Sequence, residues 1–329
     1  MVAIHALAAL FLSMVATISA SPIDSQHQPS KRCTATISSY TDIATAVSSK
    51  CTTVVVNSFT VPAGKPFDLS GLTSGTTVNV QGDVTFAAAE WSGPMFTIDG
   101  EGITFQGNGH TFDGQGKSLW DTLGSNGGKT KVFSIGSNSA QLIIDTVTID
   151  NSAGDELSGG KTLGHNTDCF DVSATNVIIK NSRCVNQDDC LAINKGSAIQ
   201  FLNNYCSGLE SRSAATPSSK VIMVFESRAS VSSITYTGNT VTSAAKYGVV
   251  IQQDYENGSP TGTPTNGVSI SDINFTGTNT VSAAASGKEV YVLCGSGSCK
   301  GTWDWAGLKV SGGSKGSITG NPPIKNFSL

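Results

Sequence analysis

Short β-branched runs, each closed by glycine, asparagine or aspartate, recur along most of the chain. Each run carries apolar residues two positions apart, as in residues 78–80, 103–105, 177–179, 199–201 and 234–236. Val177 and Ile199 stand at the same place in successive runs, so the step between them is the length of one repeat. A repeat of this length, with Asn and Gly at left-handed corners, is typical of a parallel β-helix whose β-branched side chains stack inward.

An all-β sandwich is the alternative, because its strands are also short. Sandwich strands alternate polar and apolar residues and use two-residue hairpins, whereas the Asn-Gly hairpin signal is rare here. The pattern therefore favours the β-helix. Helical periodicity is scarce, and only residues 39–47 have the spacing of a short amphipathic helix, which would cap the N-terminal end of the stack.

The first residues have the pattern of a secretory precursor. Residues 2–20 contain no acid, Lys or Arg, and residues 6–16 form an apolar stretch too short to span a bilayer well. Residues 21–32 are polar and end in a dibasic pair, which predicts a pro-segment; a tail that stays attached is the alternative. We predict a signal peptide at 1–20, a pro-segment at 21–32 and one parallel β-helix domain over 33–329.

All eight cysteines follow the dibasic pair, and an even number behind a signal peptide favours disulfides. Cys294 and Cys299 would close a small local loop, and Cys33 with Cys51 would pin the N-terminus. Neither spacing matches a zinc site with His partners. Glycosylation sequons begin at Asn257, Asn274 and Asn326.

The net charge of −4 means that the chain lacks the excess of positive charge typical of nucleic-acid-binding proteins. No segment after the signal peptide reaches transmembrane length. We expect a secreted, extracellular monomer with no nucleic-acid or membrane partner, no cofactor and no metal.

Three aspartates carry the candidate chemistry. Asp168 and the pair Asp188 and Asp189 are twenty residues apart, which fits one coil of the predicted β-helix. Equivalent positions on adjacent coils lie about 4.8 Å apart, so the three carboxylates are expected to share one small surface. Carboxylates clustered in this way cannot all stay ionised at low cost, so one of them can act as an acid.

That equipment is typical of a glycoside hydrolase. One protonated Asp would donate to the leaving glycosidic oxygen, while the others hold and deprotonate a water. Inversion by this route needs a carboxyl gap of about 6.5–9.5 Å. The alternative is that the aspartates cap turns or bind calcium, but Asn166 and Gln187 beside them strengthen the catalytic interpretation.

Several motifs together resemble the fungal polygalacturonases from about Cys33 to Gly313. The motifs are Asn166-Thr167-Asp168, Gln187-Asp188-Asp189-Cys190, Tyr247 to Gly258, Leu293-Cys294-Gly295 and Trp303-Asp304-Trp305. The resemblance implies a right-handed parallel β-helix that hydrolyses the α-1,4-galacturonan of pectin with inversion.

The same resemblance implies roles for individual residues. Asp188 would be the general acid, Asp168 and Asp189 would activate the water, and Asn166, Gln187 and Tyr247 would bind substrate. The implied disulfides are Cys33–Cys51, Cys190–Cys206 and Cys294–Cys299. Cys169 and Cys184 are outside the usual family pattern and are either free or paired with each other.

One departure from the family is chemically serious. The family carries Gly-His-Gly after the cysteine that matches Cys206, and Arg-Ile-Lys further on, and both are missing here. Arg and Lys would grip the carboxylates of a polyanionic substrate, and the His would help hold the acid's protonation. The other cations near the site, Lys195, Arg228 and Lys246, are placed by no motif.

The codons of residues 221–228, read from one nucleotide earlier, can encode Ser-Asp-Asn-Gly-Val-Arg-Ile-Lys. We therefore hypothesise that residues from about 209 to 229 come from a shifted reading frame. The leading prediction is an endo-acting polygalacturonase impaired around residues 207–230. A non-catalytic pectin-binding β-helix and a calcium-dependent pectate lyase are the alternatives, and the Asn-Thr-Asp and Gln-Asp-Asp contexts oppose the lyase.

Overall fold

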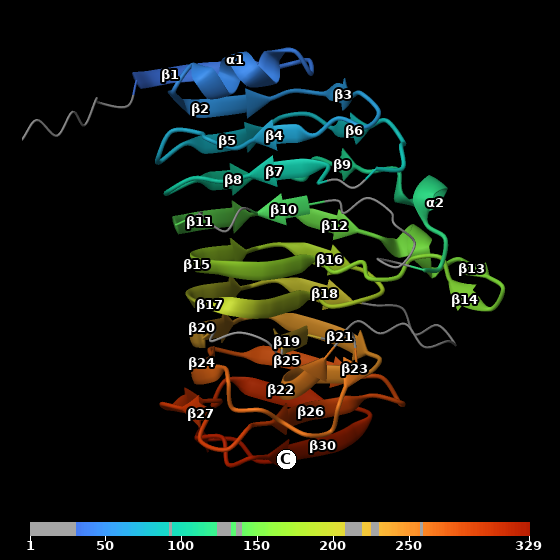
Figure 1. The fold of residues 1–329 in the computed structure, drawn as a ribbon, viewed down its shortest axis with the longest axis vertical. Coiled ribbons are helices and arrows are strands. Elements are labelled where there is room, and N and C mark those ends of the chain that lie inside the picture. Colours follow the sequence, from blue (N-terminus) through green and yellow to red (C-terminus); the bar gives the residue numbers. More distant parts are fainter. Residues whose placement is uncertain are drawn as a thin grey trace, which may run out of the picture.

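Parallel strands stack one above another along the long axis of the molecule and form a right-handed parallel β-helix (Figure 1). This computed structural model describes residues 31–91, 94–123, 133–135, 140–207, 219–224, 230–256 and 259–329. The predicted signal peptide, most of the pro-segment, the Asn257 sequon and most of residues 207–230 lie outside these ranges.

The longest sheet of the described chain runs the length of the stack, with every neighbouring pair of strands parallel. In spatial order its strands are β1 (Lys31–Ile37), β2 (Cys51–Val56), β5 (Thr77–Val80), β8 (Thr104–Gln106), β11 (Ala140–Asp145), β15 (Phe170–Lys180), β17 (Leu191–Leu202), β20 (Ser230–Thr237), β24 (Ser269–Thr276) and β27 (Cys299–Lys300).

Shorter sheets form the other sides of the coils. One contains β12 (Thr148–Asp150), β16 (Arg183–Val185), β18 (Tyr205–Ser207), β21 (Thr240–Ala244), β25 (Asn279–Ala283) and β29 (Leu308–Ser311). Another contains β19 (Ser219–Val224), β22 (Tyr247–Glu256), β26 (Lys288–Leu293) and β30 (Ser314–Thr319), with β23 (Ser259–Pro260) antiparallel to β22.

The N-terminal coils have two small sheets of their own. These are β4 (Phe67–Leu69), β7 (Phe96–Ile98) and β10 (Phe133–Ile135), and β3 (Phe59–Val61), β6 (Val84–Phe86) and β9 (Phe112–Asp113). The remaining pairs are β13 (Leu157–Ser158) with β14 (Lys161–Thr162), and β28 (Trp303–Asp304) with β31 (Ile324–Lys325).

Helices are few among the described residues. Helix α1 (Asp42–Ser48) lies across the N-terminal end of the stack, as the amphipathic spacing of residues 39–47 predicts, and buries Ile43 and Ala46 (Figure 1). Helix α2 (Gly116–Leu119) packs against the 3-10 helix η2 (Ser152–Asp155) at the side. In the ranges given above, no helix is long and apolar enough to cross a membrane.

The core lies inside the coils, and its side chains form columns along the stack. Leu142, Val177, Ile199, Ile234 and Ile273 pair in register across five consecutive strands, and each is at most 1% exposed. The predicted pairing of Val177 with Ile199 is confirmed. The steps that follow, to Ile234 and then to Ile273, are longer in sequence than the step from Val177 to Ile199.

Aromatic rings form a second column. The ring centroids of Phe201 and Tyr236 are 6.2 Å apart, those of Tyr236 and Phe275 4.7 Å, and those of Phe275 and Trp305 5.2 Å. Such offset and edge-to-face pairs add about 0.5–1.5 kcal/mol each beyond the area that they bury. These contacts hold together the coils that follow the site strands.

A ladder of buried asparagines closes one corner of consecutive coils. Asn239 Oδ1 accepts the backbone N–H of Asn204 at 3.0 Å, and Asn279 Oδ1 accepts that of Asn239 at 3.1 Å. Each side chain also donates to a main-chain carbonyl, as Asn239 Nδ2 does to Phe201 O at 2.7 Å. The amides thereby satisfy backbone groups that the strands leave unpaired at the turn.

Four disulfides pair all eight cysteines. Three are the bonds that the resemblance implies, Cys33–Cys51, Cys190–Cys206 and Cys294–Cys299. The fourth joins Cys169 to Cys184, which the sequence left open. Of the two described sequon residues, Asn326 is exposed and Asn274 is half-buried, with its Oδ1 accepting the Asp304 N–H at 2.8 Å.

Candidate active site

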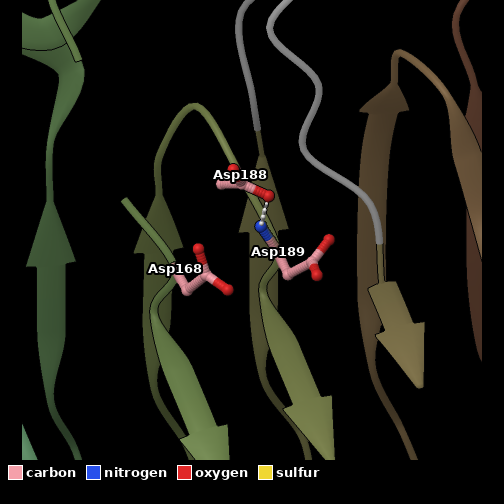
Figure 2. A group of neighbouring side chains, drawn as sticks. All are labelled: Asp168, Asp188 and Asp189. Carbon is pink, nitrogen blue, oxygen red and sulfur yellow. Dashed lines mark hydrogen bonds between the residues drawn. The ribbon is translucent and has the colours of Figure 1, made fainter. Parts of the chain in front are cut away.

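The three aspartates lie on two turns that sit side by side. Asp168 is on the turn that leads into β15, and Asp188 and Asp189 are on the turn that leads into β17 (Figure 2). The strands are parallel neighbours and pair Phe170 with Leu191, so the turns stack one coil apart. This juxtaposition is the one that the twenty-residue spacing predicts.

The carboxylates converge closely. One oxygen from each of Asp168, Asp188 and Asp189 lies within 4.8 Å of the others. Asp189 is buried at 1% exposure, whereas Asp168 and Asp188 keep contact with solvent. The Asp189 N–H donates to Asp188 Oδ1 at 2.9 Å, which fixes the Asp188 carboxylate relative to its own turn (Figure 2).

Main-chain and amide hydrogen bonds join the two turns. The Cys169 N–H donates to Asp189 O at 2.9 Å. The buried Asn186 amide donates to Thr167 O at 3.0 Å and to Asp189 O at 2.9 Å. Because these bonds connect residues directly beside the aspartates, they hold the carboxylates of one turn at a fixed place relative to the other.

Gln187 is buried at 3% exposure, and its side chain points into the protein. Its Oε1 accepts from the Thr167 hydroxyl at 3.0 Å, and its Nε2 donates to Asn151 O at 2.7 Å and to Asp155 Oδ1 at 3.0 Å. A Cβ on Gly154 would lie 2.5 Å from Gln187 Oε1. The substrate contact expected for Gln187 does not fit this environment, in which the amide bridges three segments.

The burial around Gln187 extends to an acid on the neighbouring segment. Burial raises the pKa of the Asp155 carboxyl, and the hydrogen bond from Gln187 partly offsets that rise. Asp155 Oδ2 has no hydrogen-bond partner among the described residues. Gln187 therefore supplies the contact that makes a partly desolvated carboxyl tolerable here.

Two disulfides tether the site turns to the next side of the coil. Cys169 directly follows Asp168 and bonds to Cys184 on β16, while Cys190 directly follows Asp189 and bonds to Cys206 on β18. Cys184 and Cys206 are themselves neighbours in the parallel register of β16 and β18. Each carboxylate-bearing turn is thus cross-linked to a strand of the same sheet.

Asn166 is the exposed polar neighbour of the carboxylates. Its Nδ2 donates to Asp188 Oδ2 at 3.5 Å, a long contact, and its backbone has φ of 52°. His165 Nδ1 lies 2.7 Å from Asn166 Oδ1, which orients the amide. Asn166 therefore touches Asp188 while its side chain stays exposed to solvent.

Tyr255 is a site residue that the sequence did not single out. Burial raises the pKa of its phenol, and the charges of Asp188, Asp189 and Asp168 raise it further. The phenol therefore stays protonated beside the carboxylates and can donate a hydrogen bond to them or to a ligand. It lies in the motif that starts at Tyr247, but nothing in the motif indicates which strands neighbour β17.

Tyr247 begins the same strand, β22, eight residues before Tyr255. Its ring is half-buried and lies 5.2 Å from the ring of Tyr291 on β26. Burial raises the pKa of the Tyr247 phenol, and the charge of Asp254 adds to that rise. The structure thus places Tyr255 beside the aspartates and Tyr247 with a second tyrosine.

Among the described residues, few positively charged side chains are candidates for the cationic part of the site. Lys195 is exposed on β17, Lys246 lies beside Tyr247, and Arg228 falls outside the described ranges. The cluster of carboxylates also has a spacing at which a cation can bind, so the expected absence of a metal stays a prediction.

The carboxylates, their bracing and the β-helix match one enzyme family. The profile of the Glycosyl hydrolases family 28 matches residues 51–136, 129–209 and 220–328. The chain belongs to this family. As a family 28 member, it is a glycoside hydrolase with a paired-turn carboxylate site on a parallel β-helix.

Curated relatives agree with the family assignment. Endopolygalacturonase B of Emericella nidulans is 39% identical over 366 positions, covering 96% of each chain, and a polygalacturonase of Cochliobolus carbonum is 40% identical, covering 97% of this chain and 98% of its own. The first alignment is longer than this whole chain of 329 residues, so the relative has segments that this chain lacks.

A solved structure shows the same architecture. Endopolygalacturonase I from Stereum purpureum, complexed with two galacturonate, superposes with a TM-score of 0.65 at 37% identity, covering 88% of this chain and 98% of that one. The family profile itself breaks between residues 209 and 220. This break falls within residues 207–230, the segment in which the sequence predicts a departure from the family.

Proposed function

We propose that this family 28 chain hydrolyses α-1,4-galacturonosyl linkages in polygalacturonate, the acidic backbone of pectin. The observation that carries the proposal is the meeting of Asp168, Asp188 and Asp189, with one oxygen of each within 4.8 Å of the others, on turns of consecutive coils. The relatives that are 39% and 40% identical are an endopolygalacturonase and a polygalacturonase, which supports this substrate.

Asp188 is the general acid in this proposal. It accepts from the Asp189 N–H and, at longer range, from Asn166, so its carboxyl is held in place while one face stays open to solvent. Asp168 and Asp189 hold and deprotonate the water, and the protonated phenol of Tyr255 adds a donor beside them.

The stereochemical outcome is a separate proposal, and we propose inversion on the strength of the family resemblance. One oxygen of each carboxylate lies within 4.8 Å of the others, whereas the gap of about 6.5–9.5 Å for an inverting pair separates the two carboxyl groups that act as acid and base. The shortest oxygen spacing in the cluster therefore does not measure that gap. Proton NMR of the first product formed from oligogalacturonate decides, since inversion of an α-linkage releases the β-anomer first.

We propose endo-acting hydrolysis outside the cell by a monomer. The relatives named endopolygalacturonase support the mode of attack. Four disulfides support an oxidising compartment, because such bonds persist in secreted proteins. The apolar stretch at residues 6–16 supplies the export signal in this proposal.

We also propose that the polypeptide with this sequence is a slow enzyme. It lacks the family His and Arg-Ile-Lys, which would supply positive charge to a polyanionic substrate. The break in the family match at residues 209–220 supports a local origin of the defect. Sequencing the transcript across codons 209–229 tests the frame-shift hypothesis, which fails if these residues are encoded in frame.

The test of hydrolysis is release of reducing ends from polygalacturonate by the purified full chain. We expect slow release, with kcat/KM reduced at least about 100-fold further by Asp188→Asn. Glu101→Gln, an exposed acid on another coil, is the matched control and keeps the activity of the parent chain. Folded protein that binds without hydrolysing supports the pectin-binding alternative, and an unsaturated, ultraviolet-absorbing product indicates a lyase.

A further inference from the structure

One histidine stands on a turn that carries an acid of the site. The described ranges contain two histidines, His110 and His165. His110 is on the N-terminal coils, where its Nδ1 lies 3.3 Å from Asp83 Oδ1. His165 is exposed and comes three residues before Asp168, on the turn that leads into β15. Its imidazole is therefore the one to test for a part in the chemistry of the acids.

The backbone of this turn brings the His165 side chain onto Asn166. Successive side chains of an extended strand point to opposite faces, so neighbours in sequence do not normally meet. Asn166 instead has φ of 52°, in the left-handed region that asparagine tolerates. The chain turns at this residue, and His165 Nδ1 lies 2.7 Å from Asn166 Oδ1. The contact thus depends on the conformation of the turn itself.

The contact with His165 determines which end of the Asn166 amide faces the acid. An amide oxygen only accepts hydrogen bonds, so His165 Nδ1 carries a proton and is the donor. The other end of the amide, Nδ2, then faces Asp188 Oδ2 at 3.5 Å. A reversed amide would place its oxygen against the carboxylate oxygen, and two acceptors repel each other. His165 therefore favours the orientation in which Asn166 donates to Asp188.

The oxygen that Asn166 faces is the one best placed to carry the proton of the acid. Asp188 Oδ1 already accepts the Asp189 N–H at 2.9 Å, which leaves the acid's proton to Oδ2 (Figure 2). When the O–H bond breaks and the proton passes to the leaving glycosidic oxygen, negative charge develops on this carboxylate. An N–H directed at Oδ2 stabilises that charge. The long distance of 3.5 Å fits this role, because catalytic hydrogen bonds are often long without substrate and shorten in the complex.

We propose that His165 is a positioning residue for the general acid and acts on Asp188 through the Asn166 amide. The imidazole holds the amide with its N–H toward the carboxylate oxygen that gains charge in the transition state. The proposal rests on the proposed function for the role of Asp188. It also gives the acid an imidazole partner in a chain that lacks the Gly-His-Gly motif of the family.

The kinetic signature follows from when the charge appears. Because the stabilisation grows as Asp188 loses its proton, losing it affects the transition state more than the bound substrate. His165→Ala is expected to lower kcat and kcat/KM by the same factor, about fivefold to thirtyfold, with KM nearly unchanged. In a chain that already carries Asn166→Ala, the same substitution is expected to have almost no further effect, since His165 acts through the amide.

A conservative variant and a matched control separate positioning from a general loss. Asparagine at 165 places a side-chain N–H where the imidazole has Nδ1, so His165→Asn is expected to restore most of the kcat that His165→Ala loses. His110→Ala removes an imidazole from a different coil and is expected to keep the kcat of the parent chain. Release of reducing ends from polygalacturonate measures kcat and KM, and urea unfolding of each variant checks that the full chain is folded.

The signals of the Asn166 side-chain amide report the same contact without turnover. In the ¹⁵N–¹H spectrum of the full chain they are the pair that Asn166→Ala removes. His165→Ala and Asp188→Asn are each expected to shift this pair, because each removes the partner at one end of the amide. His165→Asn is expected to return the pair toward its position in the parent chain.

Unchanged kcat in His165→Ala overturns the positioning role, and so does an equal loss in His110→Ala. A loss that is as large with Asn166→Ala already present also overturns it, because the effect then bypasses the amide. So does a loss that His165→Asn fails to restore. Absence of hydrolysis by the wild-type chain removes the proposed function and the role of His165 with it. An active chain whose amide signals ignore His165→Ala loses the positioning role alone.

Discussion

Gln187→Glu tests whether the buried amide braces the carboxylate turns. The substitution keeps the size of the side chain but removes both N–H donors, which lie 2.7 Å from Asn151 O and 3.0 Å from Asp155 Oδ1. A buried acceptor that loses its donor costs about 1–3 kcal/mol. Two such losses predict that the free energy of unfolding falls by about 2–6 kcal/mol at pH 7.

The pH dependence of this loss follows from the charge placed beside Asp155. Burial already raises the pKa of Asp155 in the folded state, and losing the Gln187 donor removes the contact that lowers it. A carboxyl with a raised folded pKa binds its proton more tightly when folded, so its contribution to stability is lost as pH rises. The deficit relative to wild type is expected to grow from about pH 4 to pH 7.

Urea unfolding followed by tryptophan fluorescence measures this deficit, with disulfides intact and the m-value compared between variants. Gln200→Glu, an exposed residue on β17, is the matched control and is expected to change stability by less than about 0.5 kcal/mol. A Gln187→Glu deficit as small as that of the control, or one that does not change with pH, would refute a bracing role.

Other expected outcomes concern the ladder, the cross-links and alkaline pH. Asn239→Ala removes the hydrogen-bond partners of two buried backbone groups, so the free energy of unfolding in urea is expected to fall by about 2–6 kcal/mol. The exposed control Asn266→Ala is expected to lower it by less than about 0.5 kcal/mol. Equal losses in the two variants would contradict a stabilising role of the asparagine ladder. Replacing both Cys169 and Cys184 by Ala removes a disulfide between residues 15 positions apart, and the free energy of unfolding is expected to fall by about 3 kcal/mol. An unchanged free energy of unfolding would contradict this expectation. Burial raises the pKa of Tyr236, so above about pH 10 its phenol ionises only in the unfolded chain and stability falls as pH rises. Tyr236→Phe is expected to reduce this fall in the free energy of unfolding. An unchanged slope against pH would show that Tyr236 does not cause it.

The fold was predictable because its strongest signal is local. Apolar residues two positions apart and the step from Val177 to Ile199 predict stacked parallel coils, and the register confirms that pairing. Coil length was less predictable. The longer steps to Ile234 and Ile273 depend on how many residues separate successive strands, and that number has no counterpart in the strand pattern.

The candidate site was predictable as far as one coil spacing reaches. Asp168 and Asp188 are brought together by the pairing of β15 with β17, which the spacing contains. The direction of the Gln187 side chain was not predictable, because the side of a turn that a residue faces depends on its backbone dihedral angles. Tyr255 was missed for another reason: it comes far after Asp189 in the sequence, so its approach depends on how the intervening chain folds.

The stacking of the two aspartate-bearing turns has a consequence for how such a molecule changes over evolutionary time. Each coil is held mainly by its immediate neighbours. The three acids, the Asn186 amide that joins their turns and both local disulfides lie between Asp168 and Cys206, so this set of residues is complete before residue 208. A lineage can lose or replace the cation-bearing coils downstream while it inherits the acids unchanged.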